Sequence, residues 1–143
     1  MAGEQILVVE DNDRNVKLLR DVLRATGYRT LEASTGGQAL TLAAAHEPAL
    51  VLMDIRLPDM SGIEALSRLR MDARTASIPV LAVTAEAMKG DRLRFTEAGF
   101  DGYLSKPVDI DELLAMVEEH CTVRGGSPRP NTMPTSGFAN RQR

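Results

Sequence analysis

Residues 49–62 read ALVLMDIRLPDMSG, an apolar run that ends at a carboxylate and leads into turn-forming residues. The apolar part covers residues 49–53, and Pro58, Ser61 and Gly62 follow soon after Asp54. An apolar run of this length between turn signals predicts a strand that is buried on both faces. Such a strand would carry the Asp54 carboxylate to the edge of a sheet, where the charge needs either a binding role or a capping role.

Comparable apolar runs recur along the chain, and segments with helical periodicity separate them. Val16, Leu19 and Leu23 share one helix face, and Gly27 follows where a terminating glycine is expected. The predicted strands are residues 6–10, 30–33, 50–53, 78–84 and 102–107, and the predicted helices are residues 16–23, 38–45, 63–71, 87–98 and 110–117. This strict alternation predicts an α/β fold of (βα)5 type, a doubly wound parallel five-stranded sheet with helices on both faces.

Composition excludes several classes of protein. Aromatic residues make up 3% of the 143 residues, there is no Trp, and the formal net charge is −3, so we expect no direct contact with nucleic acid. The single cysteine, Cys121, suits a reducing compartment. The apolar run near the N-terminus lacks a preceding basic segment, and no apolar stretch is long enough to span a membrane. We therefore expect a cytoplasmic protein without a membrane partner.

Residues 122–143 differ in composition from the rest of the chain. From residue 124 onward they contain three Gly, three Pro and four Arg but no acidic residue, and they lack helical or strand periodicity. We predict one folded domain over residues 4–121 and a disordered basic tail over residues 122–143. The tail is either a solvated extension or a weak electrostatic contact with an acidic partner or membrane surface.

Polar side chains stand where four of the predicted strands end: Glu10 and Asp11, then Asp54, Thr84 and Lys106. In an open α/β sheet, ligands bind beyond the carboxyl ends of the strands. Three neighbouring carboxylates repel one another unless a cation lies among them, and hard oxygen ligands favour Mg²⁺. Lysine and a hydroxyl beside that metal would suit a phosphoryl group, and Asp54 is the candidate acceptor.

Each of these residues also has an ordinary structural interpretation. Glu10 and Asp11 could form a solvated turn before a helix, with Asn12 or Asp13 as its N-cap. Asp54 could cap the loop that follows it, Thr84 could cap the next helix, and Lys106 could be an exposed lysine before a proline. These interpretations would have to hold at all four strand ends together.

The four motifs together resemble the receiver domain of two-component response regulators. The motifs are VVED (8–11), LMDIRLPDMSG (52–62), AVTA (82–85) and LSKP (104–107), and the resemblance covers about residues 4–121. It implies the flavodoxin-like strand order 2-1-3-4-5. The stretches VEDNDRNVKLL (9–19) and AVTAEAMKGDRLR (82–94) are most similar to DivK-type single-domain cell-cycle response regulators, although receivers of hybrid histidine kinases share some of these features.

The resemblance implies a metal site and an acceptor. Asp54 would accept a phosphoryl group from the phosphohistidine of a histidine kinase. Mg²⁺ would be bound directly by Asp11, through water by Glu10, and also by Asp54 and the main-chain carbonyl of Arg56.

The resemblance also implies a switch. Thr84 and Lys106 would contact the phosphoryl oxygens, Tyr103 would be the switch aromatic, and the Lys106–Pro107 peptide bond would be cis. Residues 87–117 would form the surface that binds a histidine kinase or a histidine phosphotransferase. Such a protein is a phospho-acceptor with slow autodephosphorylation rather than an enzyme, and a monomer or weak dimer.

Two other functions remain open at this point. The same receiver could act as a relay intermediate or phosphate sink that passes its phosphoryl group to a histidine phosphotransferase. A haloacid-dehalogenase-like phosphatase also uses a strand-end aspartate with Mg²⁺. That chemistry needs a second aspartate two residues on as general acid, and Arg56 occupies the position.

Overall fold

The computed structural model describes residues 3–85 and 91–125 of the chain. Within these residues strands and helices alternate along the whole sequence, as predicted. The elements are β1 (Gln5–Val9), α1 (Asp13–Ala25), β2 (Arg29–Ala33), α2 (Gly36–His46), β3 (Leu50–Asp54), α3 (Gly62–Met71), β4 (Val80–Thr84), α4 (Asp91–Ala98), β5 (Gly102–Ser105) and α5 (Ile110–Gly125).

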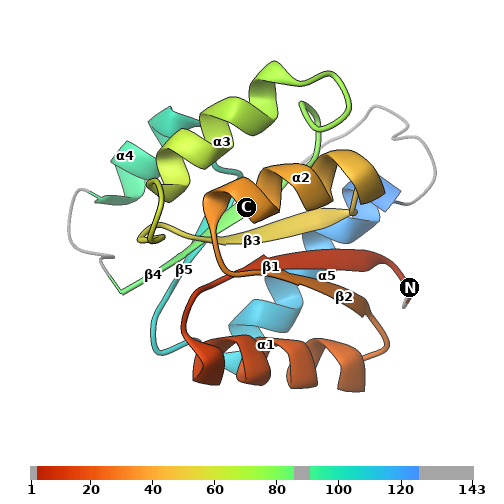
Figure 1. Cartoon of the computed structure of the whole chain (residues 1–143). Coiled ribbons are helices and arrows are strands. Elements are labelled where there is room, and N and C mark those ends of the chain that lie inside the picture. The colour runs from red at the N-terminus through yellow and green to blue at the C-terminus, as the bar shows by residue number, and fades with distance from the viewer. Residues whose placement is uncertain (1–2, 86–90, 126–143) are drawn as a thin grey trace.

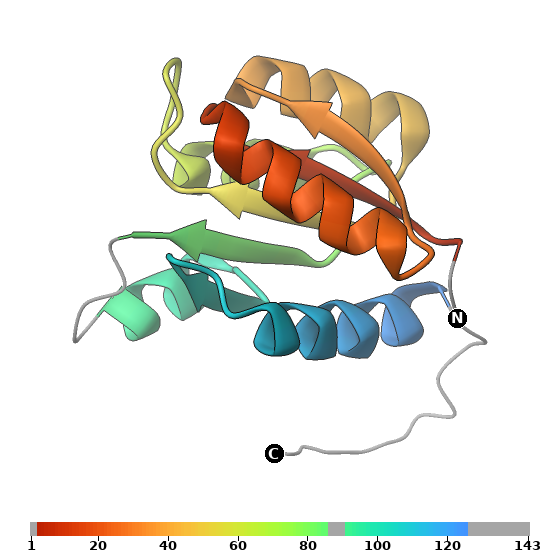
Figure 2. The same cartoon turned by 90° about the horizontal axis from the view of Figure 1, so that it is seen from below.

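All neighbouring strands are parallel, and their order in the sheet is β2-β1-β3-β4-β5. Helices α1 and α5 cover one face of the sheet, and α2, α3 and α4 cover the other (Figures 1 and 2). The predicted doubly wound fold and strand order are therefore confirmed. In this order β1 and β3 are neighbours, so their carboxyl ends lie side by side.

The central strand β3 is buried along its entire length, which explains its unbroken apolar sequence. Its side chains alternate between two cores. Val51 and Met53 pack in the core that includes residues of α2 and α3, whereas Leu50 and Leu52 pack in the core that includes residues of α1 and α5. Because both faces of β3 are covered by helices, Asp54 is the point at which this strand leaves the two cores.

Helix α1 extends beyond the predicted residues 16–23 at both ends, from Asp13 to Ala25, and the predicted start and stop residues flank it. The Asn12 side chain accepts hydrogen bonds from the backbone N–H groups of Arg14 and Asn15, which makes it the N-cap. Gly27 follows the helix with a φ angle of 105°, a left-handed conformation that favours glycine. The cap fixes the direction in which the chain leaves β1, just after Glu10 and Asp11.

Helix α2 and strand β4 also begin at residues other than the predicted ones, for local reasons. Helix α2 begins at Gly36 rather than at residue 38 because Thr35 is its N-cap and accepts a hydrogen bond from the N–H of Gln38. Strand β4 begins at Val80 rather than at residue 78, since Pro79 has no N–H group to donate to a neighbouring strand.

The predicted ends of the last two helices fall partly outside the described residues. Helix α4 is seen from Asp91 onward, and the earlier part of the predicted helix, with Gly90, is not among the described residues. Helix α5 runs to Gly125, so residues 122–125 of the predicted tail are helical, whereas residues 126–143 are not described. Within the described ranges, none of the helices has the length and hydrophobicity needed to cross a bilayer.

Candidate functional site

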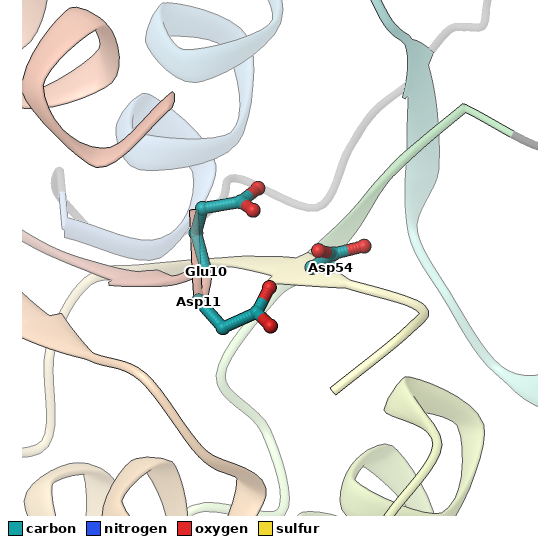
Figure 3. Close-up of side chains that lie close together, drawn as sticks. All are labelled: Glu10, Asp11 and Asp54. Carbon is teal, nitrogen blue, oxygen red and sulfur yellow. The ribbon is translucent and has the colours of Figure 1, made fainter. Parts of the chain in front are cut away.

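Three carboxylates meet at the carboxyl edge of the sheet. Glu10 and Asp11 follow β1, Asp54 ends β3, and the side chains point toward a common space (Figure 3). One carboxylate oxygen from each residue lies within 4.8 Å of the other two. Glu10 is 2% exposed and Asp54 is 6% exposed, whereas Asp11 lies at the surface. The sequence prediction that these acids converge is borne out.

Asp54 is held by the loop that follows β3. Its Oδ1 accepts a hydrogen bond of 3.1 Å from the N–H of Arg56. Gly62 packs so closely behind the strand end that a Cβ atom there would collide with the Asp54 carbonyl oxygen. Asp54 therefore does cap its loop, but Oδ2 still faces the cluster, so capping does not exclude a role in binding.

Lys106 lies between the two buried acids. Its Nζ is 2.8 Å from Oε1 of Glu10 and 3.3 Å from Oδ2 of Asp54. Burial acts to lower the pKa of Lys106, but the hydrogen bond that its ammonium donates to Glu10 and the charges of both acids outweigh this effect and raise the pKa. Lys106 therefore carries a positive charge at neutral pH. The shorter of its two contacts is made with Glu10 and the longer one with Asp54.

The pKa of Asp54 is raised even though Lys106 is beside it. Burial is the largest cause, and the charge of Glu10 adds to it, while the Arg56 N–H and Lys106 act in the opposite direction. The raised pKa values of Asp54 and Lys106 are consistent with each other. Two acids together stabilise the charge of the one lysine, whereas that lysine only partly offsets the burial of Asp54 and the charge of Glu10. Glu10 and Asp54 share the Lys106 ammonium, and Asp11 adds a third carboxylate to the cluster.

The donor set fits a hard divalent cation such as Mg²⁺. Carboxylate and carbonyl oxygens are the groups that Mg²⁺ prefers, and its coordination shell usually keeps several water molecules. The acids open onto a cleft of about 520 Å³, which leaves space for such water. The cleft is lined by Glu10, Asp11, Asn12, Asn15, Asp54, Arg56, Thr84, Ala85 and Lys106.

The structure brings Thr84 to this cleft and places Tyr103 elsewhere. Thr84 ends β4 with 1% of its surface exposed, and its carbonyl accepts a 2.9 Å hydrogen bond from the N–H of Lys106. The Lys106–Pro107 peptide bond is cis. Tyr103 is half-buried on β5, with its ring centroid 6.1 Å from that of Phe95 in α4. It lines a separate groove of about 400 Å³ with Glu112 and Met116 of α5.

Sequence reasoning overlooked two residues of the cleft as possible contributors. Asn12 was considered only as a helix cap, and Asn15 was not considered, yet both line the cleft beside the acids. The sequence does contain a sign that Asn12 and Asn15 lie near the acids, because α1 begins directly after the polar residues that follow β1. The first turn of that helix must therefore lie over the strand edge.

The sequence and the fold are matched by comparisons with known proteins. A model of the response regulator receiver domain matches residues 6–118. The chain therefore belongs to the response regulator receiver family, as the sequence motifs predicted.

Individual relatives show which members of the family the chain is similar to. The polar-differentiation response regulator DivK of Brucella ovis is 43% identical over 117 residues, which cover 82% of this chain and 95% of the relative. DivK of Brucella anthropi is also 43% identical over 117 residues, with the same coverage.

The chain is also similar to receiver domains of known structure. The receiver domain of a sensor histidine kinase from Pseudomonas aeruginosa, described with a magnesium ion coordinated in its active-site cleft, is 36% identical with a TM-score of 0.78. The match covers 84% of this chain and 98% of that one. A CheY-like receiver domain protein from Methanospirillum hungatei is 28% identical with a TM-score of 0.78 and covers 87% and 98% of the two chains.

Proposed function

We propose that the chain acts as a single-domain response regulator in a two-component phosphorelay, with Asp54 accepting a phosphoryl group from a histidine kinase. The observation that carries this proposal is the environment of Asp54. Its carboxylate lies 3.3 Å from the Lys106 ammonium, and oxygens of Glu10 and Asp11 lie within 4.8 Å. This arrangement offers an acceptor, a fixed cation and oxygen ligands for a metal in one open cleft.

In the proposed reaction an oxygen of Asp54 forms a bond to phosphorus while the P–N bond to the kinase imidazole breaks. The released imidazole nitrogen takes a proton from solvent. Lys106 stabilises the negative charge on the phosphoryl oxygens, and Thr84 is placed at the same edge for a hydrogen bond.

Mg²⁺ is the cofactor in this proposal. When bound it would neutralise charge on the phosphoryl oxygens. Glu10, Asp11, Asp54 and the main-chain carbonyl of Arg56 are the groups that would hold it. The magnesium ion described for the receiver domain from Pseudomonas aeruginosa supports this choice of metal.

The output we propose is a change in a protein-binding surface over α4, β5 and α5. Phosphorylation replaces the single negative charge of the Asp54 carboxylate by a phosphoryl group of about −1.5 to −2, and this larger charge biases a two-state element rather than creating a new site. Tyr103 and its groove beside α5 belong to residues 91–117, the described part of the predicted 87–117 surface; residues 87–90 lie outside the described ranges. The proposed partners are histidine kinases, and a histidine phosphotransferase if the protein is a relay.

The remaining parts of the proposal rest on the same resemblance. We propose a cytoplasmic signalling protein, a monomer or weak dimer, that does not bind nucleic acid directly and is not an enzyme beyond slow autodephosphorylation. The relatives from Brucella carry the name polar-differentiation response regulator, which supports a role in the cell cycle. Arg56, two residues after Asp54, disfavours the dehalogenase-like phosphatase, which needs an acid there.

The decisive experiment is phosphorylation by acetyl phosphate, followed by intact-mass spectrometry. The wild type should gain one phosphoryl group only when Mg²⁺ is present, and Asp54→Asn should gain none. If the wild type gains no phosphoryl group and binds no Mg²⁺, the proposed function is refuted. The lifetime of the phosphoryl group with and without a histidine phosphotransferase then separates relay from switch.

A further inference from the structure

The loop between β3 and α3 carries Arg56 and is fastened at its base. Ile55 and Gly62 are joined by a 2.7 Å hydrogen bond from the Gly62 N–H to the Ile55 carbonyl. Arg56 and Ser61 form an antiparallel bridge, so the loop turns back on itself directly beside Asp54. The base contacts alone do not determine where the tip of the loop lies.

The tip of the loop is fastened to a different element by Asp59. Its Oδ1 accepts a 2.8 Å hydrogen bond from the N–H of Gly36, and its Oδ2 accepts a 2.9 Å bond from the N–H of Gly37. These two groups belong to the first turn of α2, where backbone N–H groups lack partners within the helix. Thr35 serves the next such group, that of Gln38, so Asp59 and Thr35 divide the helix terminus between them.

Packing reinforces this contact. A Cβ atom at Gly36 would lie 2.7 Å from the sulfur of Met60, the residue next to Asp59, which is closer than real Cβ contacts come. The Met60 side chain therefore packs against the α2 backbone at Gly36, and a larger residue at position 36 would have to displace it. Hydrogen bonds and close packing together fix the loop against α2 at its tip.

We propose that Asp59 is a positioning residue for the metal site: by clamping the β3–α3 loop to the N-terminus of α2, it holds the main chain of Arg56 in place beside Asp54. Asp59 does not itself touch the metal in this proposal. The inference rests on the proposed function, because it assigns Asp59 a role only if the Arg56 carbonyl is a metal ligand. It adds α2 to the elements that support the site.

The test measures the Mg²⁺ dissociation constant by isothermal titration calorimetry on the full chain. Asp59→Ala should weaken binding roughly tenfold, the lower end of the effect seen when groups that orient metal ligands are removed. Asp59→Glu retains the charge and both oxygens and should recover most of the affinity. Thr35→Ala is the matched control, since it removes a cap from the same helix terminus and leaves the clamp intact.

The results separate the clamp from its alternatives. An unchanged dissociation constant for Asp59→Ala overturns the inference, and so does an equal weakening by Thr35→Ala, which would show that helix stability alone controls affinity. Loss of a distant charge is screened by salt, so an effect of Asp59→Ala that disappears at physiological ionic strength also overturns it. Failure of the wild type to bind Mg²⁺ at all refutes the proposed function instead, and the clamp falls with it.

Discussion

Replacing Gly62 by alanine tests whether close packing behind β3 holds the acceptor in place. Gly62 is the first residue of α3, and its N–H bonds to the carbonyl of Ile55. An added Cβ atom would collide with the carbonyl oxygen of Asp54 and lie 2.9 Å from the Cα atom of Ile55. Both neighbours are backbone, so the strand end or the helix must move.

The magnitude follows from two opposing effects. Inserting a methyl group into a well-packed site costs about 1–3 kcal/mol, while alanine is favoured over glycine in a helix by at most about 1 kcal/mol. We expect Gly62→Ala to lower the free energy of unfolding by about 1–2 kcal/mol. A displacement of about 1 Å can cost a reacting group on the order of 100-fold in rate. We therefore expect the phosphorylation rate of Asp54 in Gly62→Ala to fall by up to about that factor.

Two assays measure these effects separately. Urea denaturation reports the free energy of unfolding, and intact-mass spectrometry with acetyl phosphate and Mg²⁺ reports the rate of phosphorylation of the folded protein. Gly37→Ala is the matched control, because its Cβ would lie 3.5 Å from the nearest Asp59 oxygen, an ordinary contact. It should leave the phosphorylation rate unchanged. If Gly62→Ala matched the wild type in both urea midpoint and rate, the packing argument would be wrong.

Three further predictions concern charged and titratable groups. Lys106→Met should lower the free energy of unfolding by about 2–3 kcal/mol, somewhat less than for a fully buried pair, since Glu10 loses its ion partner in an open cleft; urea denaturation measures this. Burial raises the pKa of the Cys121 thiol to about 12, so the folded protein should resist thiol reagents at pH 8 and react once unfolded in urea. Hydrogen bonds from the Gly37 and Gly36 N–H groups lower the pKa of Asp59, so its stabilising effect is present above the unfolded pKa near 4 and is lost as pH falls through the lower folded value. The urea midpoint of Asp59→Asn should therefore depend less on pH below about 4 than that of the wild type; parallel curves would refute this.

The interpretation of the strand ends was correct in its main point and incomplete in its details. Glu10, Asp11 and Asp54 could be predicted to converge because parallel strands end at one edge, and the structure confirms that they do. The shorter contact of Lys106 with Glu10 could not be predicted, since it depends on how far a long side chain reaches across two strands. The capping bonds made by Asn12 and Asp54 show that a local structural role and a place in the cleft coexist.

The Asp59 clamp had no readable signal in the sequence. Asp59 follows a proline in a turn-rich segment, where acidic residues are common and most often solvated. Its partners, Gly36 and Gly37, are more than twenty positions away. Nothing in local periodicity links a loop tip to the terminus of a helix that precedes it in the chain.

The sequence by itself determined the order of the elements, their parallel arrangement and the residues that stand at the strand ends, because periodicity and turn residues are local properties of the chain. Only the tertiary structure decided which acid Lys106 contacts more closely and that Tyr103 lies in a separate groove. It also decided that Asp59 binds the β3–α3 loop to α2. Those contacts join segments that are distant in sequence. Their geometry depends on how helices pack on the sheet, which is a property of the whole fold.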